Sequence, residues 1–147
     1  MTQSNYNYFK SGISAHMEGY DMAVDVKFYR CKHCGQIITI VKGTGVPVVC
    51  CGEPMEELIP GTVDAALEKH VPVYEIKDGV VTVKVGSVEH PSLPEHFIQF
   101  IVLVSGNVVQ RADLKAGDKP EATFFIGPDA KVDAVYEYCN LHGLWKA

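Results

Sequence analysis

Four cysteines in one short stretch constrain the fold of this chain more than any other feature. Cys31 and Cys34 belong to a CKHC motif, and the adjacent pair Cys50 and Cys51 follows after fifteen residues. Two such loops can place four thiolates around one zinc or iron ion. The chain has five cysteines, and an odd number fits metal ligation in a reducing compartment better than a disulfide framework. We therefore predict a small β unit stapled by a metal, with His33 as a solvent-facing residue outside the shell.

Composition and charge exclude several classes of function. The formal net charge of -5 and the absence of a Lys/Arg run argue against nucleic acid or an acidic membrane surface as partner. No segment reaches the roughly 18 apolar residues of a membrane span, and the first residues lack the regions of a signal peptide. We expect a cytoplasmic protein with no membrane contact.

The pattern of apolar residues predicts an almost entirely β chain. Residues 1–21 show no sustained period and predict a flexible or loosely packed N-terminal extension. The segment 24–31 alternates and leads into the cysteine unit, and 57–70 is the only plausible helical stretch. Short alternating segments separated by turn residues then predict an antiparallel sandwich, at 71–77, 80–85, 97–104, 108–114, 121–127 and 131–139.

A second group of metal-binding residue types lies outside the cysteine unit. It comprises His70, His90, His96, Cys139 and His142. A single histidine is most often an ordinary surface or core residue. Pro91 and Pro94, however, stiffen the loop that carries two of these imidazoles, and a thiolate and an imidazole three residues apart can reach one transition metal. Together these residues predict a second metal site.

These motifs resemble those of desulfoferrodoxin, the two-iron form of superoxide reductase, from about Ala23 to Ala147. The resemblance rests on CKHCGQ and VCCGEPM in the first region, and on EKHVPV, EHP, PEHFI and CNLHGLWK in the second. It implies that Cys31, Cys34, Cys50 and Cys51 bind a rubredoxin-like iron. It also implies that His70, His90, His96 and His142 surround a catalytic ferrous iron, with Cys139 as fifth ligand and the sixth position open.

The resemblance also implies a fold and an activity. The expected fold is all-β, with a desulforedoxin-like module at 22–58 and an immunoglobulin-like antiparallel β-sandwich at 59–147. The expected reaction is the one-electron reduction of superoxide to hydrogen peroxide without release of dioxygen. An external donor such as rubredoxin would restore the ferrous state, and family members commonly form homodimers.

Two charged residues acquire expected roles only through the match to EKH. Lys69 would raise the positive potential at the mouth of the catalytic site and so speed the arrival of a small anion. Glu68 would approach the ferric iron as a sixth ligand after turnover and help to displace product. From the residues alone, both are more simply solvated charges at a turn.

Two other hypotheses account for parts of the sequence. One is an interaction protein made of a zinc ribbon and a β-sandwich, which has no redox chemistry. The other is an electron carrier that uses only the four-thiolate iron. Neither of them requires the five-ligand set of histidines and Cys139.

Overall fold

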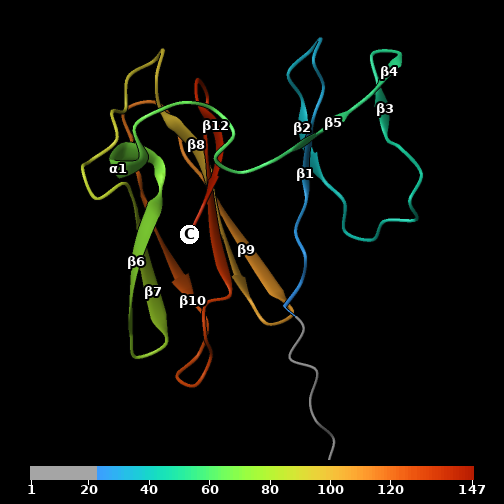
Figure 1. Ribbon diagram of the computed structural model, residues 1–147. Helices are drawn as coiled ribbons and strands as arrows, with labels where there is room; N and C mark the ends of the chain where they lie inside the picture. The colour runs from blue at the N-terminus through green and yellow to red at the C-terminus, as the bar shows by residue number, and fades with distance from the viewer. Residues whose placement is uncertain (1–22) are drawn as a thin grey trace, which may run out of the picture.

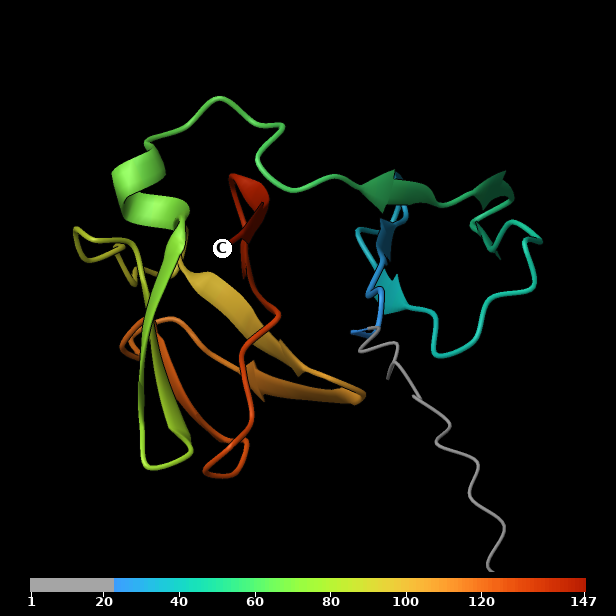
Figure 2. The same ribbon diagram turned by 60° about the horizontal axis from the view of Figure 1, so that its bottom comes forward.

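The computed structural model describes residues 23–147, so the predicted extension at 1–21 lies outside the described residues. A small N-terminal module and a larger β-sandwich lie side by side, joined by the segment that follows β5 (Figures 1 and 2). Among the described residues no helix is long and apolar enough to cross a membrane.

The N-terminal module consists of two very small sheets. The three-stranded sheet has the order β2-β1-β5, with strands Phe28–Arg30 (β1), Ile37–Thr39 (β2) and Glu56–Leu58 (β5). The hairpin of β3 (Val49–Cys50) and β4 (Glu53–Pro54) forms the second sheet. Strands this short bury little apolar surface, so a metal staple is the expected source of stability for such a module.

The sandwich is built from two antiparallel sheets. The first has the order β10-β7-β6, and the second has the order β12-β11-β8-β9. The sandwich elements are α1 (Leu67–His70), β6 (Pro72–Lys77), β7 (Val80–Val85), β8 (Ile98–Ser105), β9 (Val108–Asp113), β10 (Glu121–Phe125), β11 (Ala134–Cys139) and β12 (Gly143–Lys146). This arrangement confirms the prediction of an all-β fold with a small N-terminal module and an antiparallel sandwich.

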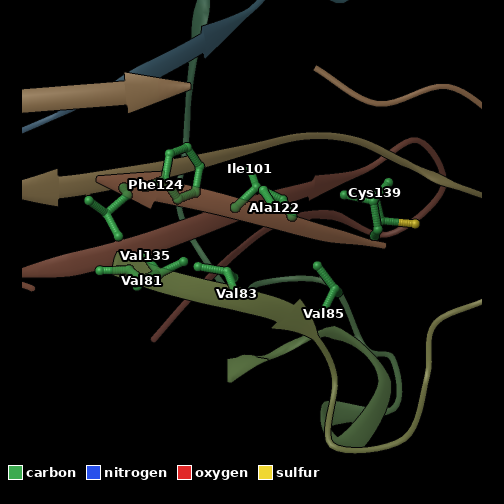
Figure 3. Close-up of a cluster of buried hydrophobic side chains, with 10 residues drawn as sticks. Val81, Val83, Val85, Ile101, Ala122, Phe124, Val135 and Cys139 are labelled. Carbon is green, nitrogen blue, oxygen red and sulfur yellow. The ribbon is translucent and has the colours of Figure 1, made fainter. Parts of the chain in front are cut away.

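The main core lies between the two sheets (Figure 3). Alternate residues of β7 point inward, namely Val81, Val83 and Val85, and each is at most 1% exposed. They face inward residues of β8 and β11 such as Ile101 and Val135. The period of two seen in the sequence is therefore the pattern of this core. Cys139 closes one end of it.

A second cluster joins the two modules. Val26 and Phe28 of the N-terminal module pack with Tyr136, Tyr138 and other apolar residues on the outer face of the four-stranded sheet. The ring of Phe28 stacks on that of Phe100 at 5.8 Å between centroids. Because β11 is covered on both faces, all six of its residues are buried.

The helical turn predicted within 57–70 is α1, a single turn at Leu67–His70. The structure differs from the sequence-based expectations at one strand. Strand β12 was not predicted. It has only four residues and begins directly after the turn that carries His142, so it offers too few positions for alternation to show.

Candidate metal centres

The four cysteines of the N-terminal module converge on one point. They come from the turn after β1 and from the β3–β4 hairpin, and their sulfur atoms all lie within 4.8 Å of one another. The Sγ atom of Cys50 lies 3.7 Å from that of Cys34 and 3.9 Å from that of Cys51. Four sulfurs at about 2.3 Å from a tetrahedral ion are about 3.8 Å apart, so the set fits a metal.

The protonation of these thiols also favours a shared cation. Backbone N–H groups, first that of Cys34, lower the pKa of Cys31 to about 6. Hydrogen bonding to Cys31 raises the pKa of Cys50 to about 12. Without a cation, ionisation of one thiol hinders ionisation of the next, whereas a bound metal ion favours the ionised form of all four. His33 is exposed, and its Nε2 lies 3.1 Å from a carboxylate oxygen of Glu53, so the prediction that it stands outside the shell agrees with the structure.

The second group gathers at one end of the sandwich. His70 ends α1, His90 and His96 lie on the loop between β7 and β8, and Cys139 ends β11. His142 lies in the turn between β11 and β12. One ligand atom from each of the five lies within 4.8 Å of all the others. Segments far apart in the sequence thus meet at a single point.

The four imidazoles form a square. Neighbouring ring centroids are 4.5 to 4.9 Å apart around the order His70, His90, His96, His142, and neighbouring rings are nearly perpendicular. The diagonal from His70 to His96 is 6.3 Å. Nε2 of His70 lies 2.9 Å from Nδ1 of His142. Nitrogens at right angles around an ion with bonds of 2.0–2.1 Å are also about 2.9 Å apart.

Backbone carbonyls set which nitrogen faces inward in two of the four rings. Nδ1 of His70 lies 2.8 Å from the carbonyl oxygen of Ala66, and Nδ1 of His90 lies 2.7 Å from that of Pro91. A carbonyl only accepts, so each Nδ1 carries the proton and donates, and each Nε2 keeps its lone pair. Nε2 of His90 and of His96 are buried and have no hydrogen-bond partner among residues 23–147. Orphaned buried nitrogens aimed at one point fit a metal ion.

Burial keeps this site neutral until a cation enters. It lowers the pKa of His90 to about 4 and is also the main cause that lowers the pKa of His70 and of His96. The charge of Lys69, which directly precedes the ligand His70, contributes to both of the latter shifts. Burial raises the pKa of the Cys139 thiol, and a bound cation would reverse that effect.

Two neighbouring residues hold the ligands in place. The Asn140 side chain accepts from the N–H of Phe97 and donates to the carbonyl of Glu95, both at 2.9 Å, so it brackets His96. Trp145 stacks on His70 at 5.0 Å and donates its indole N–H to the carbonyl of His142. In the sequence, the only signal of Asn140 is its place within the CNLH motif.

Glu137 is a further residue that the sequence analysis missed. It is fully buried in β11, two residues before Cys139, and neither carboxylate oxygen has a hydrogen-bond partner among the described residues. Burial raises its pKa to about 9, so the side chain is a neutral acid at pH 7. Besides burial, a negative charge on Glu137 would raise the pKa of the Cys139 thiol two residues further along β11.

Fold and sites together define a class of protein. It is a two-module β protein with a closed four-thiolate metal centre and a second centre of four imidazoles and one thiolate. Family models described as "Desulfoferrodoxin, N-terminal domain" and "Desulfoferrodoxin" match residues 23–58 and 62–147. The chain belongs to the desulfoferrodoxin family, and the two centres correspond to its two iron sites.

Individual relatives align over almost their whole length. A desulfoferrodoxin of Syntrophotalea carbinolica is 48% identical over 86% of this chain and 98% of the relative. One of Nitratidesulfovibrio vulgaris is 49% identical over 82% and 94%. The solved superoxide reductase of Treponema pallidum has 38% identity and a TM-score of 0.71, covering 84% of this chain and 99% of its own.

Proposed function

We propose that the protein is a superoxide reductase, an oxidoreductase that reduces superoxide to hydrogen peroxide without releasing dioxygen. Each turnover consumes one superoxide, one electron and two protons and yields one hydrogen peroxide. The observation that carries the proposal is the square of four inward-facing imidazole nitrogens with the Cys139 thiol beside it. The similarity to the Treponema pallidum superoxide reductase supports it.

The chain would hold iron at both centres. The four histidines and Cys139 would hold a ferrous iron that supplies the electron, and four neutral imidazoles with one thiolate would leave that centre a net charge near plus one. Five donors are one fewer than an octahedral ion accepts, so a small anion can bind there. The Cys139 thiolate donates electron density toward the metal, as thiolates do at haem iron. Four thiolates close the first centre, so it can pass single electrons but cannot bind substrate.

Lys69 and Glu68 are the proposed residues of substrate capture and product release. Both are exposed and directly precede His70 on α1. The ammonium group of Lys69 attracts superoxide toward the metal, although the protein as a whole is acidic. The carboxylate of Glu68 would approach the sixth position of the bound iron as product leaves, and so would help to displace peroxide.

The same proposal includes a domain division, a donor and an assembly. Residues 22–58 form the N-terminal iron module and residues 59–147 form the catalytic domain, a division supported by the two family matches. An external one-electron donor such as rubredoxin restores the ferrous state, and the exposed thiols of Cys34 and Cys51 offer such a donor access. We expect a cytoplasmic homodimer, which sedimentation analysis can test.

The experiment that tests the activity is the decay of superoxide after pulse radiolysis. The iron-loaded, reduced protein should remove superoxide in a second-order reaction much faster than spontaneous dismutation. Iron should be found at both centres, at two ions per chain. Zinc in the cysteine centre with no iron at the histidines would instead support the interaction protein, and iron without any reaction would support the electron carrier.

A further inference from the structure

Helix α1, which carries Glu68, Lys69 and His70, has little support of its own. It is a single turn, and Ala66 at its N-terminal end makes no capping hydrogen bond through its side chain. Such short helices are not stable in isolation. The position of α1 must therefore be set by contacts with the rest of the chain.

The turn after β7 supplies the backbone hydrogen bonds among those contacts, in addition to the stacking of Trp145 on His70. The N–H of Val88 donates to the carbonyl oxygen of Glu68 at 2.9 Å, and the Ser87 hydroxyl donates to the same oxygen at 3.4 Å. The N–H of Gly86 donates to the carbonyl of Val71 at 3.2 Å. The turn is therefore hydrogen-bonded to the backbone before Lys69 and after His70.

Gly86 makes this close approach possible. It is buried and has φ +81°, in the left-handed region that favours glycine. A Cβ at this position would overlap the carbonyl oxygen of Val88. It would also lie 2.7 Å from that of Glu68 and 2.8 Å from the carbonyl carbon of Lys69. All three are backbone atoms, so no side-chain rotation relieves the overlap.

We propose that Gly86 is a positioning residue for anion capture. Because residue 86 has no side chain, the turn packs directly on the backbone of α1 and holds the Lys69 ammonium group beside the square of imidazoles. This inference rests on the proposed function for the role of Lys69. It means that Gly86, which has no side-chain functional group, affects the rate at which superoxide is captured.

A matched control exists at the opposite end of the sandwich. Gly79, in the β6–β7 turn far from α1 (Figure 1), is also buried and has φ +76°. A Cβ there would lie 2.7 Å from the carbonyl oxygen of Gly127 and 2.8 Å from the nitrogen of Pro128. Gly79→Ala therefore introduces the same backbone strain and a similar backbone overlap without touching the site.

The first measurement is the rate constant with superoxide as a function of ionic strength. Gly86→Ala should react about ten-fold more slowly at low salt, with a flatter salt dependence, while Gly79→Ala keeps the slope of the unchanged protein. A wild-type slope in Gly86→Ala overturns the proposal. If Lys69→Ala also keeps that slope, the failure lies instead in the proposed role of Lys69.

A double-mutant cycle separates positioning from general damage. If Gly86 acts through Lys69, adding Gly86→Ala to Lys69→Ala should cause little further loss of rate. If the two substitutions instead reduce the rate by independent factors, the proposal is contradicted. Should Gly86→Ala fail to fold, Ser87→Ala removes one donor to Glu68 without adding an atom. It should flatten the salt dependence to a smaller extent, and an unchanged slope would again contradict the proposal.

A readout independent of turnover is amide hydrogen exchange in the zinc-loaded protein. The Val88 amide donates to Glu68, so its exchange should accelerate in Gly86→Ala and stay unchanged in Gly79→Ala. Equal protection of Val88 in both variants would show that the turn still holds α1, and the positioning role would be wrong.

Discussion

Nε2 of His70 lies 2.9 Å from Nδ1 of His142, although the two residues are 72 positions apart in the chain. Each belongs to a segment held by backbone or ring contacts, His70 through the carbonyl of Ala66 and His142 through Trp145. The square of imidazoles is therefore fixed by the fold before a metal binds. Substitutions in and around the square should affect metal binding, substrate capture and the reaction separately.

Cys139→Ser tests the thiolate ligand of the second centre. A serine hydroxyl is a harder and more weakly donating ligand than a thiolate, so the thiolate-to-iron charge-transfer absorption and peroxide production should both be lost. Absorption spectra of the oxidised protein and a peroxide assay measure the two effects. If both are retained, Cys139 is not a ligand of the catalytic iron.

Lys69→Ala tests electrostatic capture. Loss of one positive charge beside the square should slow the reaction with superoxide about ten-fold at low ionic strength and weaken its salt dependence. Pulse radiolysis over a range of salt concentrations gives both quantities. Lys77→Ala, at an exposed position on β6 far from α1, is the control and should match the unchanged protein. An unaltered rate in Lys69→Ala at low salt would refute the steering role.

Asn140→Ala tests the support of the loop that carries His96. The substitution removes two hydrogen bonds of 2.9 Å, to Phe97 and Glu95. Loss of such outer contacts typically lowers metal affinity about 10- to 100-fold. Competition with a chelator measures this affinity. Asn107→Ala, in the turn between β8 and β9, should leave it unchanged, and equal affinities in the two variants would contradict the bracketing role.

Cys34→Ser separates the two iron centres. The substitution removes one of four thiolates, so the first centre should lose its iron and the N-terminal module much of its stability. The second centre lies in the other module and should keep its absorption and its rate with superoxide. Iron analysis and pulse radiolysis provide the test. Loss of the superoxide reaction would show that the second centre depends on the four-thiolate iron and would contradict this separation.

The sandwich and the cysteine unit could be predicted because their signals are local. Alternation in 80–85 corresponds to a strand with one face in the core, whereas 98–105 is apolar almost throughout because both faces of β8 are covered. The CKHC motif and the CC pair lie on two neighbouring loops. Strand β12 could not be predicted because four residues after a turn are too few to show a period of two. The helical turn lies at the end of 57–70 because the segment begins in β5 and is then interrupted by Pro60 and Gly61.

The residues of the second centre could be singled out from their types and spacing, but their arrangement around one ion was implied only by the family resemblance. Nothing in the spacing of His70 and His142 indicates that their nitrogens meet. Asn140 and Gly86 carry no local signal either, since each matters through contacts with backbone distant in the sequence. The role of a residue that holds another segment in place can be recognised only once the position of that segment is known.

The stoichiometry of products tests the central claim most directly. The reduced, iron-loaded protein is mixed anaerobically with a known amount of superoxide, and hydrogen peroxide and dioxygen are both quantified. Reduction at the square of imidazoles predicts one peroxide per superoxide and no dioxygen. Half that yield of peroxide, accompanied by dioxygen, would mean dismutation and would contradict the assignment as a superoxide reductase.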